Sequence, residues 1–502
     1  MKIMINKKWM WQPVLIAVIA VFTVTSCKKN FLDREPLGRF TEDDITAGSF
    51  DSKVFAAYAI MRNGGFNNHE YLGIQSYRSD ESLKGSTVSD GAGAGKMFDD
   101  FEYDKTNGGI AAYWSDHYEL INAANDIIQD IDSTGASDPN TLINKGEAKF
   151  LRAFSYFDLV RAFGQVPKID FVGEPADLNV PKAPVGEIFA LIDADLQEAA
   201  SVLPRDWEAK FTGRLTKGAA LALQARAYLW RQNWAAALSS AKAVIALNRY
   251  SLVPTFYDQF KHEGENGPES IFEIQAFYTP TNDLGIIYSN VQGVRGAGQW
   301  DLGWGWNVPS QVLVDGFDAD DPRRTATILF SGQSNPPYNE VVPDYPTPVP
   351  QPYWNKKVYT NPADRLALNN RFGPWMNHRI IRYADVLLMA AEAATELGGT
   401  QNIDDALGWL EEVRKRARGN SATILPPVTT TDQGELRQAI RDERFVELAM
   451  EEQRFWDLVR WGIDVQVLTG LGKNYMIKHR LLPIPQGEID KSGGILIQNP
   501  DY

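Results

Sequence analysis

Two short segments, TKGAALALQARAYLWR at residues 216–231 and WAAALSSAKAVIAL at residues 234–247, decide the fold that we expect. Both are rich in Ala and Leu, and neither contains proline, so each predicts a helix. Only two residues separate them, so the two helices must run antiparallel as a hairpin. Small and large side chains alternate on the facing sides, at Ala225, Tyr228, Trp234, Ala237 and Ala241.

Two further pairs of segments have the same alternation of small and large residues at helical spacing. Residues 380–397 and 403–418 form a second alanine-rich pair, and residues 145–163 with 184–203 form a looser third pair. Stacked helical hairpins of this kind, with a period near 34 residues, are typical of tetratricopeptide (TPR) repeats. Generic helix pairing with chance spacing is the alternative. We predict a mainly α fold, built as a TPR-like helical hairpin platform (an α/α superhelix).

The remainder of the chain divides around this platform. Helices are also expected at 51–62, at 113–131 and, as one long helix, at 434–462. Residues 63–110 and 250–375 lack helical periodicity, and the second stretch is rich in proline, so it predicts a large irregular, loop-rich insertion. We therefore expect one body over 51–502, with helical parts at 113–248 and 379–462 and irregular parts at 63–110 and 250–375.

The composition of the chain excludes some classes of partner and of structural feature. The chain has 502 residues and a formal net charge of −14, which argues against nucleic acid as a partner, since phosphates require clustered Lys and Arg. The single cysteine excludes an internal disulfide. Fourteen Trp and nineteen Tyr are many for a chain in which no segment reaches membrane-spanning length, so some rings are expected at the surface.

The only cysteine, Cys27, follows lysines at the N-terminus, a short apolar run and the small residues Thr25 and Ser26. This order is typical of a lipoprotein signal peptide, and it predicts cleavage after residue 26 and acylation of Cys27. An ordinary secretory signal that happens to contain a cysteine is the alternative. Residues 1–26 are then the signal and 27–50 a lipidated leader.

The helix expected at 434–462 is dense in charge. Glu443, Glu447 and Glu451 are four residues apart and would share a face. Two carboxylates flanking a bond are what a glycoside hydrolase needs, so this helix could be catalytic. Arginines and aromatic residues are interleaved with the acids, however, which favours ion pairs between helices.

No cofactor is expected. The five histidines are scattered without metal-ligand spacing. The acidic cluster Asp315, Asp318, Asp320 and Asp321 lacks the spacing of an EF-hand, so a structural calcium ion is not indicated. The glycine-rich residues 91–95 do not open a helix as a phosphate-binding loop would.

The best binding candidate is the stretch QWDLGWGWN at residues 299–307, where tryptophans alternate with glycines. Aromatic rings stack on the C–H faces of sugars, and planar polar groups bind their hydroxyls. Trp300, Trp304 and Trp306 would supply the rings, and Asp301, Asn307 and Gln299 the polar groups. The alternative is that the rings pack the insertion onto the platform. A second candidate region contains Tyr77, Arg78 and Asp80, together with residues 67–69.

Several motifs, in order along the chain, carry a family resemblance. They are FLD at 31–33, the Trp114, Tyr118, Ile121, Ala124 and Asn125 pattern, EAKFLRA at 147–153 continuing to FGQVP at 163–167, RYADVLL at 382–388, ER at 443–444, RFWDL at 454–458 with RWG at 460–462, and LPIP at 482–485. Over its whole length the chain resembles the SusD/RagB family of outer-membrane nutrient-binding lipoproteins.

The resemblance implies a TPR platform carrying an irregular binding half. It also implies a lipid-anchored protein at the outer membrane, facing the cell exterior, that binds an oligosaccharide or similar nutrient without cleaving it and delivers it to a SusC-like TonB-dependent transporter. Family members place ligand contacts in the two candidate regions named above. Two rivals stay open at this point, namely a glycoside hydrolase using the acidic helix and a TPR scaffold for envelope assembly.

Overall fold

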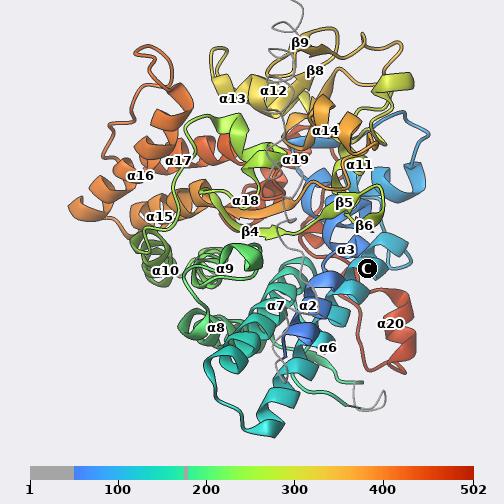
Figure 1. The fold of residues 1–502 in the computed structure, drawn as a ribbon, viewed down its shortest axis with the longest axis vertical. Coiled ribbons are helices and arrows are strands. Elements are labelled where there is room, and N and C mark those ends of the chain that lie inside the picture. The colour runs from blue at the N-terminus through green and yellow to red at the C-terminus, as the bar shows by residue number, and fades with distance from the viewer. Residues whose placement is uncertain (1–49, 174–178) are drawn as a thin grey trace, which may run out of the picture.

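The computed structural model describes residues 50–173 and 179–502, and it is mainly helical, as expected (Figure 1). Long helices form one half of the molecule and shorter elements with two-stranded ribbons form the other. The mainly α fold class is confirmed.

Five consecutive helices begin the platform: α6 (Gly108–Thr134), α7 (Pro139–Phe163), α8 (Val185–Val202), α9 (Lys217–Trp230) and α10 (Trp234–Ala246). Side chains cap several of them, because Asn107, Asp138, Thr216 and Asn233 each accept a backbone N–H of the first turn. The α9–α10 hairpin begins and ends within one residue of the prediction. Its alanines Ala225, Ala237 and Ala241 are fully buried, so the two helices approach closely.

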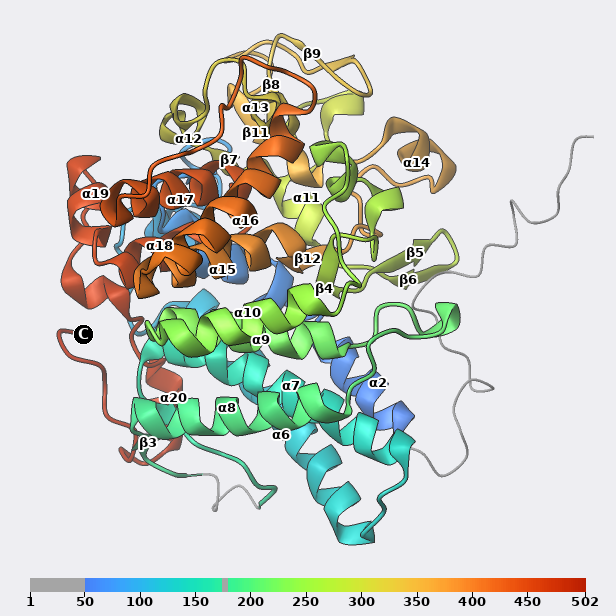
Figure 2. The ribbon, with the colours of Figure 1, turned by 90° about the vertical axis from the view of Figure 1, so that its left-hand side faces the viewer.

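The platform continues across the insertion. Helix α15 (Tyr383–Leu397) packs directly on α10, and α16 (Thr400–Arg418) and α17 (Gln433–Glu447) pack on α15. Figure 2 shows α8, α9, α10 and α15 stacked as successive layers. The residues between α10 and α15 therefore loop out of an unbroken helical array.

Two expected helices need correction. Residues 380–382 belong to strand β12 (His378–Arg382), which pairs with β4 (Ser270–Ile274), so the helix begins only at Tyr383. The long helix expected at 434–462 is two helices, α17 and α18 (Arg454–Trp461). Met450 and Glu452 between them have positive φ angles of 63° and 58°, which a continuous right-handed helix cannot contain.

The insertion is irregular, as predicted, but it is well packed. Its strands form small antiparallel pairs, β5 (Phe277–Thr279) with β6 (Asn282–Leu284), β8 (Ile328–Phe330) with β11 (Tyr353–Asn355), and β9 (Ser334–Asn335) with β10 (Glu340–Val341). Short helices connect them: α11 (Tyr288–Gln292), α12 (Gln311–Gly316), α13 (Pro322–Thr327), α14 (Pro362–Ala367), and the single turns Phe256–Phe260, His262–Gly264, Gly298–Trp300 and Lys356–Val358.

The segment that follows α2 (Asp51–Ile60) is not the long loop that we expected. It folds as α3 (Gly64–Asn67), α4 (His69–Leu72), a π-type turn (Gly73–Tyr77), β1 (Ser82–Gly85), a second π-type turn (Ala92–Lys96) and α5 (Met97–Asp99). Residues 71–82 are buried throughout. Their hydrophobic pattern has neither a helical nor a strand period, because both sides of the segment face protein.

The C-terminal part closes the platform with α19 (Asp464–Gly470), a 3₁₀ turn (Ile477–Arg480) and α20 (Gln486–Lys491). A short ribbon, β2 (Val166–Pro167) with β3 (Lys182–Ala183), joins α7 to α8, and one more 3₁₀ turn (Ala209–Phe211) precedes α9. None of the described helices is long and apolar enough to cross a bilayer. The predicted signal, Cys27 and almost all of the leader lie outside the described residues.

Candidate functional site

The tryptophan loop, residues 299–307, is held by backbone hydrogen bonds to residues 290–294. The backbone N–H groups of Leu302, Trp304 and Gly305 donate to the carbonyls of Val294, Asn290 and Gly293, each at 2.9 Å. Glycine is required where the two segments meet, because a Cβ on Gly303 would lie 2.1 Å from the Asn290 carbonyl oxygen. The alternating glycines therefore fix the loop tightly against its neighbour.

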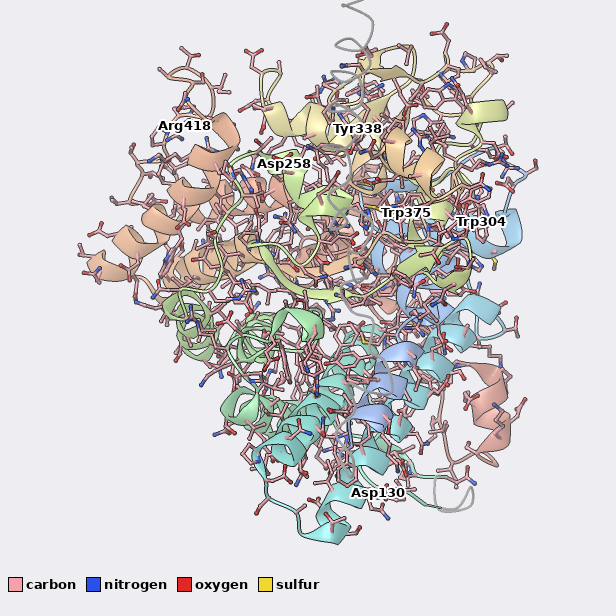
Figure 3. All side chains as sticks on the ribbon, viewed as in Figure 1. Asp130, Asp258, Trp304, Tyr338, Trp375 and Arg418 are labelled. Carbon is pink, nitrogen blue, oxygen red and sulfur yellow. The ribbon has the colours of Figure 1, made fainter. Side chains whose placement is uncertain are left out.

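Three rings gather at the end of this loop. Trp304 and Trp306 lie edge to face with their centroids 5.4 Å apart, and His69 contacts both, at 6.1 Å and 5.5 Å. Trp306 is buried at 6% exposure, whereas Trp304 and His69 are half-buried. Figure 3 shows Trp304 at the edge of the molecule. The structure thus brings together parts of both candidate regions predicted from the sequence, residues 67–69 and 299–307.

Trp306 belongs to the frame beneath this surface. It starts strand β7 (Trp306–Pro309), which pairs with β1 with Gly85 opposite Trp306. Its indole N–H donates to Asp90 at 2.9 Å, and Gly91 packs so closely on the ring that a Cβ there would lie 2.0 Å from it. The glycine-rich residues 91–95 therefore accommodate an indole, which explains a motif that the sequence left without a role.

Charged groups surround the rings in pairs. Arg371 bonds Asp301 at 2.7 Å, and Arg295 lies 3.0 Å from Asp90; both arginine side chains are more than 40% exposed. Burial alone would raise the pKa of Asp90, but hydrogen bonds from Trp306 and Ser86 together with Arg295 lower it on balance. The rim therefore presents partly exposed polar atoms while its charges are compensated. No local pattern marks Arg295 or Arg371, because each pairs with an acid far along the chain, Arg295 with Asp90 and Arg371 with Asp301.

Two of the predicted loop residues are in the core. Trp300 is 6% exposed and packs with Val294, Leu302 and Trp354. Asn307 is fully buried; it accepts a hydrogen bond from Ser76 Oγ and donates to Gln292, both at 2.8 Å. In this structure both side chains are occupied by contacts with protein, as the packing alternative describes. Their role is to hold the loop.

The second predicted group is also buried. Tyr77 and Arg78 are fully inaccessible and Asp80 is 3% exposed. Arg78 lies 4.0 Å from the centroid of the Phe455 ring, and Asp80 forms a bidentate pair with Arg454 at 2.7 Å. Arg78 and Asp80 join residues 71–82 to α18, so the contacts that this structure shows for them are structural, and contact with a ligand stays a prediction.

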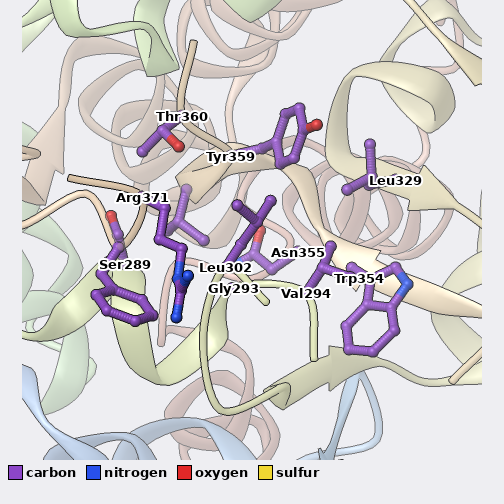
Figure 4. A pocket seen from close by; sticks show the side chains of 12 residues that line it. Ser289, Gly293, Val294, Leu302, Leu329, Trp354, Asn355, Tyr359, Thr360 and Arg371 are labelled. Carbon is purple, nitrogen blue, oxygen red and sulfur yellow. The ribbon is translucent and has the colours of Figure 1, made fainter. Parts of the chain in front are cut away.

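A small cavity of about 10 Å³, room for about one water molecule, lies beside the tryptophan loop (Figure 4). Its lining includes Ser289, Leu302, Tyr359, Arg371 and Phe372. The Ser289 hydroxyl is buried and has no hydrogen-bond partner in the described part of the chain. The cavity is too small for a sugar ring.

The acidic residues of the α17 region are not catalytic. Glu447 lies within 3.2 Å of Arg323, Arg382 and Arg416, and its side chain is fully buried. Burial alone would raise the pKa of Glu447, but these arginines outweigh burial and lower it to about 2. A general acid needs the opposite, a raised pKa beside an accessible bond. The ion-pair interpretation of this region is confirmed.

Glu443 and Glu451 join the same set of charges. Glu443 pairs with Arg323 and with Arg414, and Glu451 lies 2.6 Å from Arg382. We call Arg323, Arg382, Arg416, Glu269, Glu443, Glu447 and Glu451 the arginine–glutamate network. Within residues 50–173 and 179–502 no group of three or more His, Cys, Asp or Glu side chains is arranged to hold a metal ion.

The fold and the site define a class, a TPR-like helical binding protein with an aromatic surface site on an irregular half. The SusD family model matches residues 268–502, and a second model, described as starch-binding associating with outer membrane, matches residues 30–229. The chain belongs to the SusD/RagB family. Membership makes it a binding protein and not an enzyme, and the glycoside hydrolase alternative falls.

Individual relatives agree with this assignment. SusD-like protein P2 of Formosa agariphila is 29% identical over 97% of this chain and 98% of its own length. The starch-binding protein SusD of Bacteroides thetaiotaomicron is 26% identical over 66% of each chain. Among solved structures, a laminarin binding SusD-like protein aligns with a TM-score of 0.75 and 28% identity, covering 90% of this chain and 98% of that protein.

Proposed function

We propose that this chain binds a neutral oligosaccharide on the open surface around Trp304. The observation that carries the proposal is one half-buried indole held edge to face against a buried one, with His69 beside it. Such a ring is fixed in orientation before the ligand arrives, so little conformational freedom is lost on binding. Asp301, Arg371 and Arg295 at the rim offer hydrogen-bonding groups whose charges are already paired.

The relatives support a glycan as the ligand. One similar structure is named for laminarin and one curated relative for starch, and both are neutral polysaccharides. The paired charges at the rim agree with a neutral ligand, because an anionic polymer would have to displace Asp90 and Asp301 from their arginines.

The finer parts of the proposal concern the cell. We propose that Cys27 carries a lipid that holds the protein at the outer membrane, facing the exterior, and that it delivers its ligand to a SusC-like TonB-dependent transporter. The description of one matching family model as associating with the outer membrane supports the location. A TPR scaffold for envelope assembly is the remaining alternative, and it predicts no affinity for glycans.

The test is calorimetry with a panel of neutral hexasaccharides (laminari-, malto-, cello- and xylohexaose). Trp304→Ala is expected to weaken binding of the recognised glycan about tenfold or more, about 1.4 kcal/mol, since a rigid aromatic anchor is typically a dominant contact. Trp409→Ala, which removes another half-buried indole on α16, is the control and should bind as the wild type does. Equal affinities for both variants would refute the site.

A further inference from the structure

A second hollow lies far along the chain from the tryptophan loop, between α6 and α20. Its volume is about 560 Å³, which is within the range of small-molecule sites. Residues of α6, of the β2–β3 connection and of the C-terminal segment line it, among them Trp114, Ser115, Tyr118, Asn179, Glu488 and Lys491. Figure 1 shows α6 and α20 in the lower part of the molecule, while Trp304 lies higher, as labelled in Figure 3. We call this hollow the α6–α20 pocket.

The half-buried Tyr118 ring forms a fixed wall of the pocket, and the buried Trp114 ring packs against it. Trp114 and Tyr118 are one helical turn apart on α6, with ring centroids 5.0 Å apart. The Tyr118 hydroxyl donates to the Pro167 carbonyl at 2.8 Å, which ties the ring to the ribbon. The wall is therefore set by the fold before any ligand binds.

The pocket also carries polar groups that a ligand can bond. The Ser115 hydroxyl and the Asn179 amide belong to exposed residues that line it, and they make no side-chain hydrogen bonds within residues 50–173 and 179–502. Ligand hydroxyls can therefore take the place of water at these two groups.

Charge and polarity select the class of ligand. Glu488 and Lys491, the charged residues of the lining, pair with each other at 2.8 Å, so the pocket presents no net charge. A purely apolar ligand would cover Ser115 and Asn179 without satisfying them, which is costly. A neutral polyhydroxylated ligand can stack on the Tyr118 ring and bond these two polar groups.

We propose that the α6–α20 pocket is a second binding site for a neutral sugar. This inference rests on the proposed function in one respect, because it assumes the same class of ligand, a neutral sugar. Two sites on one chain would hold a long glycan at two points, which raises its apparent affinity without new contacts at either site.

The test is to block the pocket with a bulky side chain. Ser115→Trp places an indole on an exposed position of α6 that lines it, and Asn122→Trp places the same indole on an exposed position of α6 outside it. Both are made in the wild-type and the Trp304→Ala proteins, and thermal melts confirm that each folds. Calorimetry uses the hexasaccharide panel named above.

We expect two sugars bound per wild-type chain and one per Trp304→Ala chain. The Ser115→Trp change should remove the remaining site, with at least a tenfold loss of affinity, and Asn122→Trp should not.

Loss of all binding in Trp304→Ala alone would overturn the second site and leave the proposed function standing. Residual binding that Ser115→Trp does not alter would also overturn it. Binding lost to Ser115→Trp but not to Trp304→Ala would keep this pocket and refute the tryptophan-loop site. A chain that binds none of the four glycans would refute both.

Discussion

The tryptophan loop and the arginine–glutamate network are the two chemically dense regions of this molecule, and they are built in opposite ways. The network unites charges from the insertion (Arg323), from β12 (Arg382) and from α16 and α17, and none of its side chains is more than 11% exposed. The loop gathers rings and leaves one of them, Trp304, half in solvent. In the sequence each region suggests a site.

The two regions differ in whether their functional groups already have partners within the protein. In the network each glutamate of α17 has at least two cationic partners, so the charges offer nothing to a substrate. They join the irregular half to the platform instead. At the loop, an apolar ring and partly exposed polar atoms remain available to a ligand. A high density of functional groups does not by itself indicate a binding site. Groups that remain accessible at the surface, without partners that occupy them fully, are the better indication.

The largest expected effect is in the network. Glu447→Ala should lower the free energy of unfolding by about 3–5 kcal/mol, because it leaves Arg323, Arg382 and Arg416 buried with fewer counter-charges. Asp442→Ala, an exposed acid on the same helix, should change it by less than about 0.5 kcal/mol. Denaturant unfolding of both variants measures this. Equal stabilities would mean that the network does not hold the two halves together.

The next effect separates the two tryptophans. Trp306→Ala should destabilise the protein by about 3 kcal/mol, because it empties the space under Gly91 and leaves Asp90 without its indole donor. The packing alternative that the sequence left open for each loop tryptophan predicts this loss for Trp306. Trp304→Ala, compared by the same denaturant titration, should cost clearly less because its ring is half exposed. If the order were reversed, the division into frame and binding ring would be wrong.

The third expected effect is a gradual loss of thermal stability at acid pH. The pKa of Glu447 in the network is lowered to about 2, and so is that of Asp385, a separate buried acid that pairs with Arg226 and Arg444. Both pKa values are below the usual values near 4, so these groups stabilise the fold above about pH 4.5 and lose that contribution as the pH falls toward 2. Burial raises the pKa of Glu265 to about 7, and this opposes any loss between pH 7 and 4.5. Melting temperatures should therefore hold from pH 7 to 5 and decline below 4.5. Glu447→Gln should flatten the decline, and a decline that begins above pH 6 would contradict this assignment.

Helices were predictable where one face is apolar. The α9–α10 hairpin was located to within a residue because both helices are short, capped and alanine-rich. Residues 71–82 were missed because burial on both sides removes the period. The break between α17 and α18 was missed because Met450 and Glu452 adopt a left-handed backbone that carries no sequence signal.

The site was predictable as a region but not residue by residue. Composition singled out the tryptophan loop, and the structure placed His69 beside Trp304. Which rings and charges are buried depends on contacts across hundreds of residues, such as Arg454 with Asp80, and no local pattern records them.

The sequence by itself determined the family, the helical platform and the presence of an aromatic loop, because periodicity and motif order are local properties of the chain. Only the tertiary structure decided that α15 continues the stack from α10, that the acidic helices hold a closed ion network, and that Trp304 faces outward while Trp306 supports it. The physical reason is that exposure and charge compensation belong to pairs of distant segments, and they exist only once those segments have packed.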